Sequence, residues 1–164
     1  MKNTDPPHSK SQNLKLSPEL TRFVENMGMY FESYGIPRIG GRILGLLMVA
    51  HEPLSAECIA SVLKVSRASI STNFRVLLTS GLAEKVTFPG NRTTYFAFPE
   101  TAWEKTMTVE VQAISAMKKI AQQGLDALPA NDSARGRMEG LISWADFLIE
   151  IYQNGLIEWR KRIT

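Results

Sequence analysis

The stretch that decides the fold is Ser55–Phe98, which reads SAECIASVLKVSRASISTNFRVLLTSGLAEKVTFPGNRTTYFAF. Ser55 and Ser66 are each placed to cap the start of a short helix, and Lys64-Val65 forms the turn between the two helices. Two short helices joined by a tight turn predict a helix-turn-helix. The inward positions of its second helix recur at i, i+4, i+7 and i+8 and are Ile70, Phe74, Leu77 and Leu78.

A β-hairpin is predicted directly after this pair of helices. Gly81 ends the second helix, and the strand-like runs Leu82–Phe88 and Thr93–Phe98 follow, joined by Pro89-Gly90-Asn91-Arg92. A turn-forming Pro-Gly-Asn between β-branched and aromatic runs is typical of a hairpin. The order of the elements therefore indicates a winged helix-turn-helix with Arg92 at the tip of the wing.

Outward toward the N-terminus, two more helices are predicted. One begins at Ser17-Pro18, a cap followed by proline at the first helical position, and it ends near Gly35. The other opens at Pro37 and contains Gly40-Gly41, a pair that indicates close backbone approach to a neighbouring element. Residues 1–16 are polar and interrupted by proline, so we expect a flexible, solvated tail there.

Toward the C-terminus the pattern is helical throughout. One helix is expected from about Glu100 to Leu128, and residues 129–132 separate it from a second helix. The second helix carries one apolar face and, beside it, a further apolar stripe made of Trp144, Phe147 and Ile151. This coverage is too wide for packing against one neighbour, so we expect a partner subunit to cover the second stripe.

The fold class expected from these elements is mainly α with a small β-hairpin wing. We divide the chain into a flexible tail (1–16), an N-terminal dimerisation helix (17–35), a winged helix-turn-helix DNA-binding domain (36–99) and a C-terminal helical dimerisation region (100–164). No stretch has the length and apolarity of a membrane span or signal sequence, and the single cysteine fits a reducing compartment. We therefore expect a cytoplasmic protein without membrane contact.

Positive charge gathers in the middle of the chain. The whole chain has a net charge of +3 and a pI near 9.1. Residues 36–98 alone carry seven Lys or Arg against three Glu, which leaves +4. In addition, the outward face of the second helix of the helix-turn-helix contains no carboxylate, and this composition favours contact with a polyanion.

Six residues are the candidates for contact with double-stranded DNA. Small hydroxyls on a helix in the major groove can reach base edges or nearby phosphates, and arginines can anchor to phosphates or enter a narrow minor groove. We therefore assign base-edge or phosphate contact to Ser69, Ser71 and Thr72, and phosphate or groove anchoring to Arg67, Arg75 and Arg92.

These motifs resemble the GbsR-like branch of the MarR regulators. The resemblance covers residues 20–100 well and is carried, in order, by Pro37–Gly45, Ser66–Ser71, Gly81–Ala83 and Pro89–Arg92. It implies a homodimeric transcriptional regulator, expected to be a repressor, that binds a pseudo-palindromic operator through the helix of residues 66–80 and the wing arginine. Many members respond to a small-molecule effector, and some sense choline or related osmolytes. One departure is that asparagine precedes the wing arginine, where the wider family often has an acidic residue.

Other interpretations of the same residues stay open. A protein-interaction module is the main alternative function, and it would need an exposed apolar patch on the second helix. No enzyme, cofactor or metal is indicated, since His8 and His51 lack metal-ligand spacing and no catalytic motif is present. Cys58 falls on an inward helix face, which favours packing over redox sensing. Two roles are open for the aromatic residues: they could form a cage for a quaternary ammonium ligand, or they could simply pack along the helices. These residues are Tyr30, Phe31, Trp103, Trp144, Tyr152 and Trp159.

Overall fold

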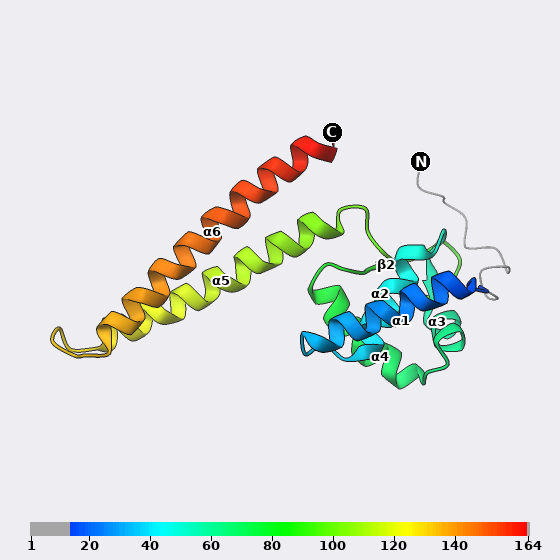
Figure 1. Cartoon of the computed structure of the whole chain (residues 1–164), viewed down its shortest axis with the longest axis horizontal. Helices are drawn as coiled ribbons and strands as arrows, with labels where there is room; N and C mark the ends of the chain where they lie inside the picture. The colour runs from blue at the N-terminus through cyan, green and yellow to red at the C-terminus, as the bar shows by residue number, and fades with distance from the viewer. Residues whose placement is uncertain (1–13, 164) are drawn as a thin grey trace. The chain divides into compact units, whose positions relative to one another are not determined.

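Figure 1 shows the computed structural model, which describes residues 14–163. The chain divides into two compact units, one up to Ala102 and the other from Trp103 onward. Residues 1–13 of the expected tail lie outside the described residues. The last part of that tail differs from the expectation, because Leu14 and Leu16 are half-buried and pack against the core of the first unit.

The first unit contains four helices and a small antiparallel sheet among its described residues. In chain order these elements are α1 (Pro18–Ser33), α2 (Arg38–Val49), β1 (Leu54–Ser55), α3 (Ala56–Leu63), α4 (Arg67–Thr79), β2 (Glu84–Val86) and β3 (Tyr95–Ala97). The sheet order is β1-β3-β2, so the hairpin strands β2 and β3 are extended by a strand that precedes α3. The mainly helical fold with a small wing is therefore confirmed, and β1 is an addition to it.

Local side-chain bonds explain where the helices begin. The hydroxyls of Ser17, Ser55 and Ser66 each accept a hydrogen bond from the backbone N–H three residues later, at 3.2, 3.1 and 3.2 Å. All three predicted caps are confirmed. Between α3 and α4, Lys64 adopts the left-handed conformation with φ of 55°, which turns the chain tightly into the second helix of the motif.

Aliphatic side chains of α2, α3 and α4 form the core of this unit. The Phe74 ring on α4 stacks on the Phe96 ring of β3, with centroids 3.7 Å apart, and so ties the helix-turn-helix to the wing. Side chains that are fully excluded from solvent include Ile43, Leu44, Leu46, Ile59 and Ile70. Burial of these residues fixes which side of α4 is left to face outward.

The glycine pair of α2 lies against α1 with almost no space between the backbones. A Cβ on Gly41 would lie 2.5 Å from the carbonyl oxygen of Met27 and 2.9 Å from the Cα of Gly28. A Cβ on Gly40 would lie 3.0 Å from Oδ1 of Asn73 on α4. The predicted close approach is confirmed, and its partners are α1 on one side and α4 on the other.

Two arginines of α2, in the basic middle segment, form hydrogen bonds to the neighbouring helices α1 and α3. Glu25 on α1 accepts hydrogen bonds from Arg38 at 3.1 Å and from Arg42 at 2.8 Å. Arg42 also donates to the carbonyl oxygen of Leu63 at the end of α3, at 3.0 Å. These two cations therefore stabilise the packing of the helices, and the charge available to a partner comes from the other basic residues of the segment.

The second unit is an antiparallel pair of long helices (Figure 1). They are α5 (Ala102–Ala127), close to the expected Glu100–Leu128, and α6 (Arg135–Ile163), which follows the expected break. Arg135 donates to the carbonyl oxygens of Leu125 and Leu128 at 3.1 and 3.0 Å, which satisfies free carbonyls at the end of α5. The side chains most deeply buried in this unit are Ile114, Ala121 and Ala145.

Large apolar side chains on α6 remain exposed in the single chain. Trp144, Phe147 and Ile151 are 49%, 60% and 48% exposed. They are the residues of the second stripe predicted from the sequence, and α5 does not cover them. No described helix combines the length and apolarity that crossing a bilayer requires.

Candidate nucleic-acid interface

The outward face of α4 is polar and positively charged. Arg67, Ser71 and Arg75 follow one another at intervals of four residues and are exposed, and Thr72 is exposed beside them. No Asp or Glu lies between the first and last residues of α4. Such a surface can approach a phosphate backbone without repulsion between like charges.

The three candidate hydroxyls differ in their existing hydrogen bonds. The Thr72 hydroxyl donates to the carbonyl oxygen of Ala68 at 3.1 Å, so it is available mainly as an acceptor. Ser69 is half-buried, and its hydroxyl lies 3.0 Å from that of Ser66. Ser71 is exposed and engages none of the described residues through its hydroxyl, which leaves that group able to donate and to accept.

Two features of α4 were missed by sequence reasoning. Asn73 is only 7% exposed, and its side-chain N–H donates to the carbonyl oxygen of Ser69 at 2.8 Å. It faces Gly40, and a polar residue three positions after the inward Ile70 was the available signal. Val76 is 46% exposed and adds one apolar side chain to the otherwise polar face.

The wing is organised by the asparagine that precedes its arginine. The backbone N–H of Asn91 donates to the carbonyl oxygen of Phe88 at 3.1 Å, and Gly90 in this turn has φ of 75°. The Asn91 side chain accepts from the backbone N–H of Thr93 at 2.8 Å and donates to the hydroxyl of Tyr95 at 3.0 Å. These bonds hold the backbone on both sides of Arg92, whose side chain is exposed.

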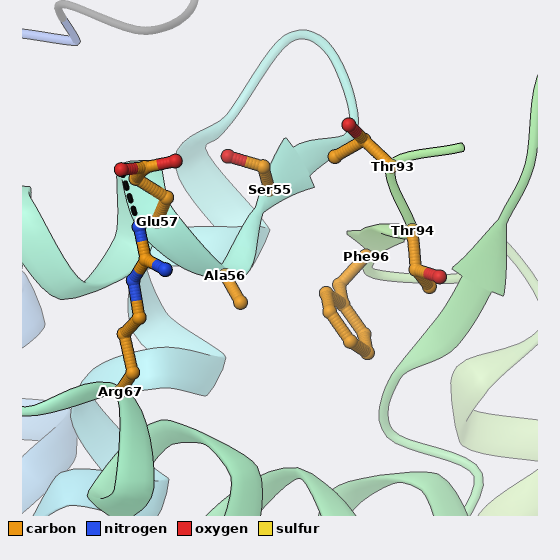
Figure 2. Close-up of a pocket in the computed structure, with 7 residues that line it drawn as sticks. All are labelled: Ser55, Ala56, Glu57, Arg67, Thr93, Thr94 and Phe96. Atoms are coloured by element: carbon orange, nitrogen blue, oxygen red, sulfur yellow. Dashed lines mark hydrogen bonds and ion pairs between the residues drawn. The ribbon is translucent and has the colours of Figure 1, made fainter. Parts of the chain in front are cut away.

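A pocket of about 320 Å³ lies where α3, α4 and the wing meet (Figure 2). Arg67 and Glu57 form one side of it, Thr93 and Thr94 form the other, and Ser55 lies between them. The start of α4 and the residue that follows the wing arginine therefore share one concave surface. The remaining lining residues are Ala56 and Phe96.

The basic residues between positions 64 and 92 fall into two groups. Arg67 forms an ion pair with Glu57, and both side chains are well exposed. In contrast, four cations have no ion-pair partner among the described residues and are free to meet phosphates: Lys64, Arg75, Lys85 and Arg92. The predicted set of site residues thus lies on one unit, with Arg67 alone already engaged by a carboxylate.

Residues considered for other chemistry lie apart from this face. Cys58 is 4% exposed on the inner side of α3, and its burial raises the pKa of the thiol above its ordinary value. These features favour a packing role.

Tyr30 packs edge-on against Phe31, with centroids 5.4 Å apart, and lies 5.0 Å from the Tyr34 ring. Among residues 14–163, no three His, Cys, Asp or Glu side chains gather as metal ligands would.

Known proteins are similar to this chain in both sequence and overall fold. Residues 101–162 match the family model described as MmpR5-like MarR family transcriptional regulator. The chain is 36% identical over 137 residues to the HTH-type transcriptional regulator MmpR5 of Mycobacterium tuberculosis, and the match spans 80% of this chain and 83% of that protein. A crystal structure of a transcriptional regulator superimposes with a TM-score of 0.81 at 32% identity, covering 88% of this chain and 99% of the other.

Proposed function

Because this chain belongs to the MmpR5-like MarR family of DNA-binding transcriptional regulators, we propose that it binds a pseudo-palindromic operator as a homodimer and represses transcription in the cytoplasm. The family is one of regulators and not of enzymes. The observation that carries the proposal is the exposed face of α4, which presents two arginines and several hydroxyls and has no carboxylate.

We assign the DNA contacts in two groups. Ser69, Ser71 and Thr72 would meet base edges or nearby phosphates, and Ser71 has the hydroxyl best able to do so. Arg67, Arg75 and Arg92 would anchor to phosphates or a groove. Val76 joins the first group, because an exposed apolar side chain on a helix in the major groove can contact the methyl group of thymine.

Dimerisation would use the exposed apolar stripe of α6. Trp144, Phe147 and Ile151 are about half exposed, which is unusual for large apolar side chains that share one helix face. A homodimer that binds a pseudo-palindromic operator presents its two recognition helices to half-sites about 34–36 Å apart. Assignment to the GbsR-like branch and response to a small-molecule effector remain predictions of the sequence resemblance.

Arg92→Ala is expected to weaken operator binding for all sequences and to make its salt dependence shallower. Loss of one arginine–phosphate contact should reduce the slope of log affinity against log salt by about one unit. Fluorescence anisotropy with labelled duplex at several salt concentrations measures this slope. Lys15→Ala, which removes an exposed cation from a segment with no assigned role in binding, serves as the control. A slope equal to that of the unsubstituted protein would remove Arg92 from the interface.

A further inference from the structure

Arg67 differs from the other candidate arginines because a carboxylate of the same chain already binds it. It is the first residue of α4, and its Nη2 donates to Oε1 of Glu57 in the first turn of α3. Figure 2 shows this pair at one side of the pocket that the wing residues Thr93 and Thr94 line from the other side. Glu57 is therefore a negative charge within the surface that is proposed to meet DNA.

The ion pair between Arg67 and Glu57 costs little free energy to break. The side chains of Arg67 and Glu57 are 70% and 76% exposed, and one hydrogen bond joins them. Ion pairs this exposed contribute about 0–1 kcal/mol, because water solvates both partners and the side chains lose entropy when they pair. By comparison, Glu25 holds two arginines at once, and the Arg42 side chain in that cluster is only 20% exposed.

We propose that Glu57 competes with DNA phosphate for Arg67. In the free protein Glu57 holds the guanidinium at the edge of the pocket, and on binding Arg67 exchanges this carboxylate for a phosphate of the operator backbone. Glu57 thereby lowers the affinity for DNA and sets how much Arg67 contributes to it. The inference rests on the proposed function, since it assumes that this face meets DNA.

Two physical effects explain why Glu57 should lower the affinity for DNA. Arg67 must leave one anion to reach another, so the new contact yields less free energy than it would from an unpaired arginine. The released carboxylate then lies close to the phosphates, where repulsion between like charges opposes binding. Both effects disappear if Glu57 is replaced by glutamine, which keeps the shape of the side chain and loses its charge.

The test compares Glu57→Gln with the unsubstituted protein in two backgrounds. Using a labelled operator duplex at fixed salt, we expect Glu57→Gln to raise affinity roughly threefold to tenfold. In a chain that already carries Arg67→Gln, the same change should raise affinity by a clearly smaller factor, since the competition is gone and only the repulsion between Glu57 and the phosphates is removed. Glu52→Gln, which lies outside the candidate DNA contacts and the dimerisation helices and has no ion pair to the described residues, should leave affinity unchanged.

Each outcome decides the proposal. An unchanged or lower affinity for Glu57→Gln would overturn it, the latter because Glu57 would then orient Arg67 toward DNA. An equal gain in both backgrounds would also overturn it, because simple repulsion would suffice. Thermal unfolding should be unaltered, since both side chains are exposed. Failure of the proposed function itself is distinguishable, because the unsubstituted protein would then not bind the duplex at all.

Discussion

Replacing Gly41 by alanine is expected to destabilise the protein by about 3 kcal/mol, the largest effect foreseen for a single methyl group in this chain. The added Cβ would lie 2.5 Å from the backbone oxygen of Met27 and 2.9 Å from the Cα of Gly28, well inside van der Waals contact. Because these are backbone atoms in α1, no side-chain rotation can relieve the overlap. Helix α1 would have to move away from α2.

Chemical denaturation followed by circular dichroism measures the change, and a second glycine provides the control. A Cβ on Gly140 in α6 would meet no atom within 4 Å. Gly140→Ala should therefore stabilise its helix by about 0.5–1 kcal/mol, through lower entropy of the unfolded chain. Equal free energies of unfolding for Gly41→Ala and the unsubstituted protein would contradict the close packing of α1 on α2.

Phe147→Glu is expected to convert the dimer to a monomer and to weaken operator binding by roughly 10²–10⁴-fold. Phe147 is 60% exposed within the single chain, so a charge there should leave the helix pair folded. In a dimer, the same charge would be buried among apolar side chains of the partner without a counter-ion. Loss of pairing removes the second half-site contact, and with it the gain from bivalent binding.

Sedimentation velocity measures the oligomeric state, and duplex titration measures the affinity. Gln153→Glu adds the same charge about half a turn away from the stripe of Trp144, Phe147 and Ile151, and it should remain dimeric. Truncation after Leu128 would also abolish the dimer, although it would uncover Ile114 and Ala121 as well. A dimeric Phe147→Glu variant would place the subunit contact elsewhere.

Much of the first unit could be predicted because its signals are local. A serine cap acts on a backbone N–H three residues away, so Ser17, Ser55 and Ser66 could be recognised from short windows of sequence. The glycine pair of α2 also carried a clear meaning, since two glycines inside a helix require a reason. In contrast, β1 has two residues, and nothing within Leu54–Ser55 reveals that it pairs with β3.

Contacts between separate elements were harder to foresee. From the sequence alone, Arg38 and Arg42 are part of the positive charge that is available to a partner. The structure shows that packing of α1 brings Glu25 to both of them. The pairing of Arg67 with Glu57 likewise depends on the angle between α3 and α4. Outside the first unit, residues 101–162 match the MmpR5-like family model, although helical pattern was the one signal that we could extract from them.

The structure shows where the six candidate site residues lie, but their contact with DNA is a separate question. Five of the six are exposed, and Ser69 is half-buried at the edge of the face. The bonds that Asn91 makes show how the wing can be ordered without an acidic residue before Arg92. Contact of these six residues with DNA remains a prediction.

Selection of bound sequences from a pool of random duplex DNA, with the full chain at near-physiological salt, tests the central claim most directly. The account predicts enrichment of an inverted repeat whose half-sites lie about one helical turn apart, as two α4 helices in successive major grooves require. A pool that shows no enriched sequence, with weak salt-sensitive binding alone or none, would contradict sequence-specific binding by a homodimer.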